Sequence, residues 1–68
     1  MATVDARGLS CPQPVILTRK AIEVGEFPIE VLVDTATSRD NVTRAAQRAG
    51  LKVTVEEAPT GFRLVIER

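Results

Sequence analysis

The sequence contains no histidine, tyrosine or tryptophan, and has a single cysteine and two phenylalanines among its 68 residues. Without histidine, the chain cannot build a Cys-His nucleophile pair and has no ordinary base that titrates near neutral pH. One cysteine without histidine does not assemble a zinc site, so we expect no metal and no cofactor. A lone cysteine also excludes an internal disulfide. Small domains of this kind are typical of reducing compartments, and we therefore expect a cytoplasmic protein.

The charges of the chain balance, and its aromatic content is low. Nine basic residues match nine acidic residues, so no net field attracts nucleic acid or an anionic membrane. Phe27 and Phe62 are too few to form a base-stacking platform. The longest aliphatic runs are triplets such as VIL and VLV, which cannot span a membrane. We expect no nucleic-acid or membrane partner and, for so short and well-charged a surface, a monomer.

Helical spacing of apolar residues occurs in two segments. The first segment covers residues 12–24. The apolar positions of its expected buried face are Leu17, Ala21 and Val24. The second helix is predicted to begin at Thr37, which forms a capping-box-like pair with Asp40, and to close at Gly50.

Alternating apolar residues predict four short strands. The turn sequence APTG joins the last two strands as a hairpin. The alternate positions of these two strands are polar apart from Val65, so one sheet face is expected to stay wet while both helices cover the other. The strands are predicted at 2–6, 28–34, 51–56 and 62–67. The sequence therefore predicts one α/β domain over residues 1–68, a two-layer βαβαββ sandwich with a mixed four-stranded sheet and two helices on one face.

The only cysteine, Cys11, stands directly before Pro12, with Pro14 two residues further on, at the start of the first predicted helix. Prolines at the first and third helical positions remove N–H donors that have no partner inside the helix. Pro12 also favours an extended Cys11, so we expect Cys11 at the N-cap with its sulfur over the helix start. Such a site stabilises an anion by up to about 2 kcal/mol and favours the thiolate. Arg7 and Arg39 are candidates to add to this stabilisation.

Burial is the competing interpretation of a lone cysteine, since free cysteines are often small buried hydrophobes. The loop position, the expected cap and the two prolines favour an exposed nucleophile instead. A chain with so few other reactive groups is suited to thiol exchange or to carrying a group on sulfur.

Asp5, Gly8 and the segment Cys11-Pro12-Gln13-Pro14 match the D-x-x-G-x-x-C-P-x-P signature of the TusA/SirA/YedF family of small sulfur-carrier proteins. The resemblance extends over the whole chain, including the βαβαββ order and the ATSRD segment before the second helix. It implies a two-layer sandwich similar to the C-terminal domain of bacterial translation initiation factor three.

The resemblance also implies a role in a sulfur relay. Members of the family accept sulfur as a persulfide from a cysteine desulfurase, or another sulfane-sulfur donor, and pass it to a thiol acceptor protein. Cys11 would bear this sulfur, and residues 12–14 would position the helix start. Asp5 and Gly8 match signature positions that shape the loop before Cys11, although both residue types are also ordinary in turns.

Other interpretations stay open at this point. Arg39 matches a recurrent basic position that could face the persulfide, or it is a solvated surface charge. Residues 34–37 read DTAT where sulfur-relay members often read DPAT, and Asn41-Val42 is closer to YedF-type members linked to selenium metabolism. From other classes, the alternatives are a redox-regulatory domain that forms a mixed disulfide through Cys11, and a protein- or RNA-binding module.

Overall fold

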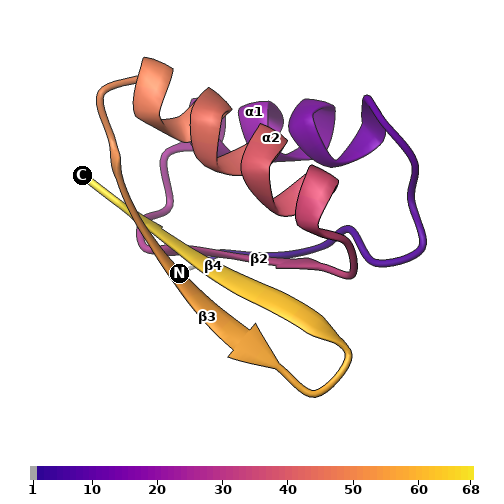
Figure 1. The fold of residues 1–68 in the computed structure, drawn as a ribbon. Coiled ribbons are helices and arrows are strands. Elements are labelled where there is room, and N and C mark those ends of the chain that lie inside the picture. The colour runs from indigo at the N-terminus through magenta and orange to yellow at the C-terminus, as the bar shows by residue number, and fades with distance from the viewer. Residues whose placement is uncertain (1) are drawn as a thin grey trace.

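Six elements build the fold in the βαβαββ order that the sequence predicts (Figure 1). The computed structural model describes residues 2–68, so Met1 of the predicted domain lies outside the described residues. The elements are β1 (Ala2–Asp5), α1 (Gln13–Val24), β2 (Ile29–Val33), α2 (Ala36–Arg48), β3 (Lys52–Ala58) and β4 (Gly61–Glu67). Neither helix in this part of the chain combines the length and apolar character needed to cross a bilayer.

The strands form one mixed sheet in the order β1-β2-β4-β3. β1 and β2 run parallel, whereas β4 is antiparallel to both β2 and β3. Figure 1 shows α1 and α2 side by side over one face of this sheet, which confirms the predicted two-layer sandwich. Because β1 and β2 are parallel neighbours, with Asp5 beside Leu32, the loops that follow these two strands meet at one edge of the sheet.

The core lies between the sheet and the two helices. β2 alternates strictly between buried residues that face the helices and half-buried residues on the open face. The small Ala46 lets α2 approach the sheet closely, and each large aliphatic residue of this core contributes about 1.5–3 kcal/mol. The fully buried apolar residues are Ala6, Ile29, Val31, Val33, Val42, Ala46, Leu64 and Ile66.

The buried face of α1 differs from the prediction at one end. Pro14 and Thr18 are its buried residues, whereas Val24 is 68% exposed. The Thr18 hydroxyl donates a hydrogen bond of 2.8 Å to the carbonyl oxygen of Pro14. This bond satisfies the polar group and allows it to face the core. The predicted stripe is therefore wrong at Val24, because the helix turns the line through Pro14, Thr18 and Ala21 towards the sheet.

The open face of the sheet is polar, as predicted. The Arg63 guanidinium forms ion pairs with Glu30 on β2 and with Glu56 on β3, the latter at 2.7 Å. One residue of the opposite face is also solvated: Val55 on the edge strand β3 is 43% exposed. An edge strand has a sheet neighbour on one side only, so less of its apolar face is covered.

The N-cap residue of α2 lies two residues earlier in the sequence than predicted. Thr35 is the N-cap residue, with an extended backbone at φ −129° and ψ 154°, and its hydroxyl accepts a hydrogen bond of 3.1 Å from the Ser38 N–H. Thr37, the predicted cap, lies inside the first helical turn. Both threonines carry the same hydroxyl, and the extended backbone that continues from β2 decides between them.

Replacing Thr35 with alanine should therefore destabilise the domain by about 1 kcal/mol, the usual cost of losing an N-cap hydroxyl. Urea denaturation followed by circular dichroism would measure the change. Thr37→Ala is the matched control, because it removes the same group one half-turn away, and we expect a change of no more than about 0.5 kcal/mol. A larger loss for Thr37→Ala than for Thr35→Ala would contradict this cap.

Candidate functional site

Cys11 lies in the turn before α1, one position earlier relative to the helix than predicted. The N-cap is Pro12, with φ −100° and ψ 16°, and α1 begins at Gln13. The carbonyl oxygen of Pro12 accepts the first bond of the helix, from the Ile16 N–H at 3.1 Å, which makes Pro12 rather than Cys11 the cap. The Gln13 N–H donates to the Ser10 carbonyl oxygen at 3.0 Å and is therefore engaged within this turn.

The three motif residues after Cys11 have different surroundings. Pro12 and Gln13 are exposed at the helix start, whereas Pro14 is buried against the core as the second residue of α1. A proline at this position loses no hydrogen bond, since the first N–H groups of a helix have no partner within it. Pro14 therefore ties the helix start, and with it Cys11, to the folded core.

The thiol of Cys11 is free and exposed. It lines two neighbouring depressions of the surface. The first, which we call the loop hollow, has a volume of about 430 Å³ and lies between residues 8–11 and the start of α2 at Asp34, Thr35, Thr37 and Ser38. The second, which we call the helix groove, has a volume of about 240 Å³ and runs between α1 and α2. Burial, the competing interpretation of this cysteine, is therefore excluded.

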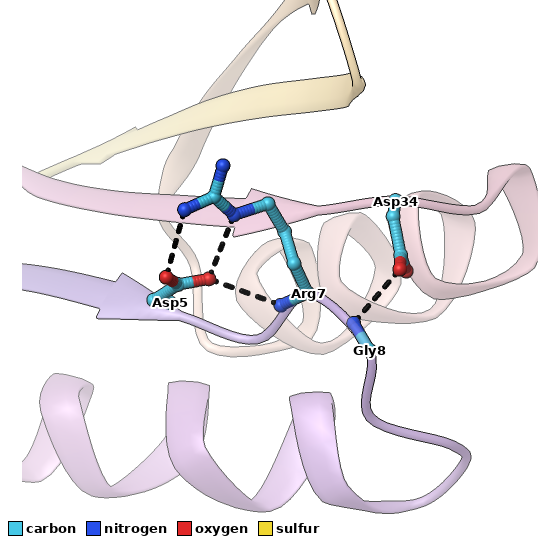
Figure 2. Close-up of polar contacts among 4 residues, drawn as sticks. All are labelled: Asp5, Arg7, Gly8 and Asp34. Atoms are coloured by element: carbon cyan, nitrogen blue, oxygen red, sulfur yellow. Dashed lines mark hydrogen bonds and ion pairs between the residues drawn. The ribbon is translucent and has the colours of Figure 1, made fainter.

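The loop that carries Cys11 is held by a contact from a distant part of the chain. The Gly8 N–H donates a hydrogen bond of 2.8 Å to Oδ2 of Asp34, 26 residues away at the end of β2 (Figure 2). Gly8 has φ 76°, a left-handed conformation that glycine adopts without steric cost. Sequence reasoning missed this role of Asp34, which is visible in the sequence only as the start of the DTAT segment.

Asp34→Ala should loosen this loop while leaving the sheet in place. We expect faster hydrogen exchange at the Gly8 amide and a stability loss of about 1 kcal/mol, since an exposed hydrogen bond to a charged group is removed. Asp34→Asn is the control, because its side-chain oxygen can still accept the bond although the charge is gone. Unchanged exchange at Gly8 in Asp34→Ala, measured by NMR, would show that this contact does not hold the loop.

Asp5 and Arg7, two of the predicted site residues, pair with each other. Oδ1 of Asp5 accepts hydrogen bonds from the Arg7 backbone N–H at 3.2 Å and from Nε at 2.9 Å, and Oδ2 accepts from Nη2 at 2.9 Å. Hydrogen bonds from the Arg7 side chain and backbone lower the pKa of Asp5 to about 2. Figure 2 shows the guanidinium folded back over Asp5, on the side of the strands away from α1. Arg7 therefore braces the end of β1 and lines neither depression beside Cys11.

Arg39, the other predicted anion-stabilising residue, also has partners elsewhere. Its Nε forms an ion pair of 2.9 Å with Asp40, and its guanidinium lies 4.6 Å from the centre of the Phe62 ring on β4. Arg39 lines neither the loop hollow nor the helix groove. The structure thus brings Gly8 and Pro12 beside Cys11 but keeps Arg39 apart from them.

Three other arginines lie beside Cys11, where Arg7 or Arg39 was expected. Arg19 of α1 and Arg44 and Arg48 of α2 line the helix groove together with Cys11. The i, i+4 spacing of Arg44 and Arg48 placed them on one helical face in the sequence, but only the packing of α2 beside α1 shows that this face lies next to the thiol. Sequence reasoning did not identify these residues.

The fold and the site define a class of protein, a small α/β domain that presents one exposed thiol before the first turn of a helix. The family model described as "Sulfurtransferase TusA" matches residues 2–68. The chain belongs to this TusA family, and the family expected from the sequence signature is confirmed.

Two relatives and one solved structure resemble the chain over nearly its full length. A protein of Methanocaldococcus jannaschii is 38% identical, with 100% of this chain and 95% of the relative covered. A protein of Archaeoglobus fulgidus is 36% identical, with 100% and 97% covered. Both are named "Putative sulfur carrier protein". The crystal structure of a SirA-like protein from Desulfitobacterium hafniense matches with a TM-score of 0.85 and 38% identity, over 98% of this chain and 95% of that one.

Proposed function

We propose that the protein is a sulfur carrier that bears sulfane sulfur as a persulfide on Cys11. The observation that carries this proposal is the position of the only thiol of the chain, which is free, exposed and held at the start of α1 by a buried proline. The family and the names of the two relatives support the same function.

Loading and delivery are both thiol–persulfide exchanges. The Cys11 thiolate attacks the terminal sulfur of a donor persulfide, the S–S bond of the donor breaks, and the donor cysteine leaves as a thiolate. In delivery, an acceptor thiolate attacks the outer sulfur on Cys11, and Cys11 leaves as the thiolate. The sulfur atom moves at constant total oxidation state, so neither step needs an external oxidant or reductant.

The partners follow from the cysteine count. The chain has no second thiol that could resolve the persulfide, so both exchanges must be intermolecular. The proposed partners are a cysteine desulfurase, or another sulfane-sulfur donor, and a downstream protein that offers a thiol. A selenium-linked pathway of the YedF type would use the same attack geometry.

Each signature residue has a positioning part in this proposal. Pro12, Gln13 and Pro14 set the start of α1, and Gly8 with its bond to Asp34 sets the path of the loop that leads to Cys11. Asp5 fixes the end of β1 through Arg7. Arg7 and Arg39 each would have to leave a bound carboxylate to reach the sulfur, and the proposal does not depend on either of them.

Intact-mass spectrometry after incubation with a cysteine desulfurase and free cysteine tests the proposal. The protein should gain the mass of one sulfur atom, and a reductant should remove it. Glutathione disulfide in place of the desulfurase is the comparison. A protein that forms the glutathione adduct readily but gains no sulfur from the desulfurase, or from an inorganic polysulfide, would be a redox-regulatory domain instead.

A further inference from the structure

The helix groove beside Cys11 has a strongly basic lining. Arg19, Arg44 and Arg48 are exposed, and none of them forms an ion pair within residues 2–68, whereas Arg7, Arg39 and Arg63 do. The part of the groove next to Cys11 contains no acidic residue. A nearly neutral chain thus places three unpaired positive charges along one groove that leads to its only thiol.

The groove is also apolar between its charged rims. The half-buried Val15 of α1 and Ala45 of α2 lie between the exposed arginines. It continues along both helices past Ile22 and Ala49, where Glu23 is the first acidic residue to line it. The preferred ligand is therefore an elongated segment with apolar side chains between carboxylates, and its negative charge belongs near the Cys11 end.

We infer that the helix groove docks an acidic peptide segment of a protein that exchanges sulfur with Cys11. This segment lies next to that protein's own reactive cysteine. This inference rests on the proposed function for its biological context, although the binding it describes does not require sulfur transfer. The distance from Pro12 to Arg19 along α1 is about 10 Å at 1.5 Å per residue. An extended chain covers that distance in about three residues. The carboxylates therefore belong within about three to four residues of the partner cysteine.

Charge complementarity in this geometry accelerates encounter and sets the orientation of the partner. An acidic segment laid over the three arginines places its cysteine at the Cys11 end, where the S–S exchange takes place. A basic segment is repelled from the same groove. Steering of this kind raises association rates by about 10- to 1,000-fold at low salt and is screened as salt increases.

The test uses three synthetic peptides and a disulfide reporter on the full chain. Cys11 is first converted to its mixed disulfide with pyridine-2-thiol. The peptide thiolate then attacks the Cys11 sulfur, the old S–S bond breaks, and pyridine-2-thione leaves and is followed by absorbance. The peptides are Cys-Glu-Leu-Glu-Leu-Glu and its counterparts with glutamine or lysine in place of glutamate. 2-Mercaptoethanol, which is small and carries no charge other than that of its reacting thiolate, measures the intrinsic reactivity of the disulfide.

At low salt the glutamate peptide should react about tenfold faster than the glutamine peptide, and the lysine peptide should react most slowly. At about 0.5 M salt the three peptides should react at similar rates, because salt screens the charges. Arg44→Gln and Arg48→Gln should each slow the glutamate peptide about threefold and should slow 2-mercaptoethanol less, since its thiolate is the only charge it brings to the groove. Lys20→Gln is the matched control, since it removes one positive charge from the exposed side of α1 outside the groove, and it should leave the rate nearly unchanged.

Equal rates for the three peptides, or an equal effect of Lys20→Gln and Arg44→Gln, would overturn the inference. Failure of the proposed function looks different, because the peptide preference would persist while the desulfurase fails to load Cys11. Loading by the desulfurase without any peptide preference would leave the sulfur-carrier proposal intact and remove the acidic dock.

Discussion

Cys11→Ser is expected to gain no sulfur from a cysteine desulfurase under conditions in which the wild-type chain is fully loaded. A serine hydroxyl cannot form the S–S bond of a persulfide, and the chain has no other thiol to take its place. The expected effect is complete loss of the reducible mass increase in intact-mass spectrometry. Because the side chain is exposed, the free energy of unfolding in urea should stay within about 0.5 kcal/mol of the wild type.

Moving the thiol by one residue tests whether loading depends on the position of the thiol as well as on its reactivity. Ser10 is exposed and lines the loop hollow, so the double variant Ser10→Cys, Cys11→Ser keeps one accessible thiol in the same turn. It should react with a small disulfide reagent but accept sulfur from the desulfurase about a hundredfold more slowly, since the proposed docking aligns the donor persulfide with residue 11. Normal loading of Cys11→Ser alone would refute the assignment of the carrier site.

Gly61→Ala is expected to destabilise the domain more than Asp34→Ala or Gly8→Ala does. A Cβ at this position would lie 2.2 Å from the Val33 carbonyl oxygen and 2.7 Å from Cα of Asp34. Both are backbone atoms at the end of β2, beside the β4 ladder, so neither can turn aside as a flexible side chain would. Gly61 also has φ 149°, which other residues adopt only with strain. We expect a loss of about 3 kcal/mol, a large share of the stability of so small a domain.

The substitution should also loosen the loop before Cys11. The crowded backbone atoms belong to Val33 and Asp34, and the Asp34 carboxylate accepts the hydrogen bond from Gly8. Urea denaturation measures the stability loss, and hydrogen exchange at the Gly8 amide reports the loosening of the loop. Gly8→Ala is a useful comparison: it also has a positive φ, but nothing lies within 4 Å of the added Cβ. Its cost should be limited to the backbone term of about 1–2 kcal/mol. Equal losses for the two variants would show that the close approach at Gly61 is relaxed without difficulty.

The sequence alone predicted the order of the elements and the exposure of the thiol. Hydrophobic spacing is a local property: β2 alternates residue by residue, and Val42 and Ala46, the buried apolar residues of α2, lie four residues apart. The arrangement of Cys11 before two prolines was also readable, because prolines restrict the backbone of their immediate neighbours. For the same reason the helix start was predicted to within one residue.

Competition between similar local signals was harder to resolve. Thr35 and Thr37 carry the same hydroxyl, and the choice of cap depends on where the extended backbone of β2 ends. For α1 the alternatives are Cys11 and Pro12. Pro12 is the N-cap because its carbonyl oxygen accepts the first hydrogen bond of the helix. Val24 was assigned to the buried face by its spacing, but the rotation of α1 on the sheet is set by the packing of Pro14 and Thr18.

The charged groups of the site were decided by the tertiary structure alone. Asp34 reaches Gly8 across 26 residues because parallel pairing of β1 and β2 brings their following loops to one edge of the sheet. The sequence shows nine basic residues but not which of them share a surface with Cys11. Arg39 lies against Phe62, whereas Arg44 and Arg48 line the groove beside Arg19. Arg39, Arg44 and Arg48 all belong to α2, and only the packing of α2 against α1 decides which helical face lies next to the thiol. Local sequence thus determined the elements and the exposed position of the only thiol, and long-range packing determined the charged groups around it.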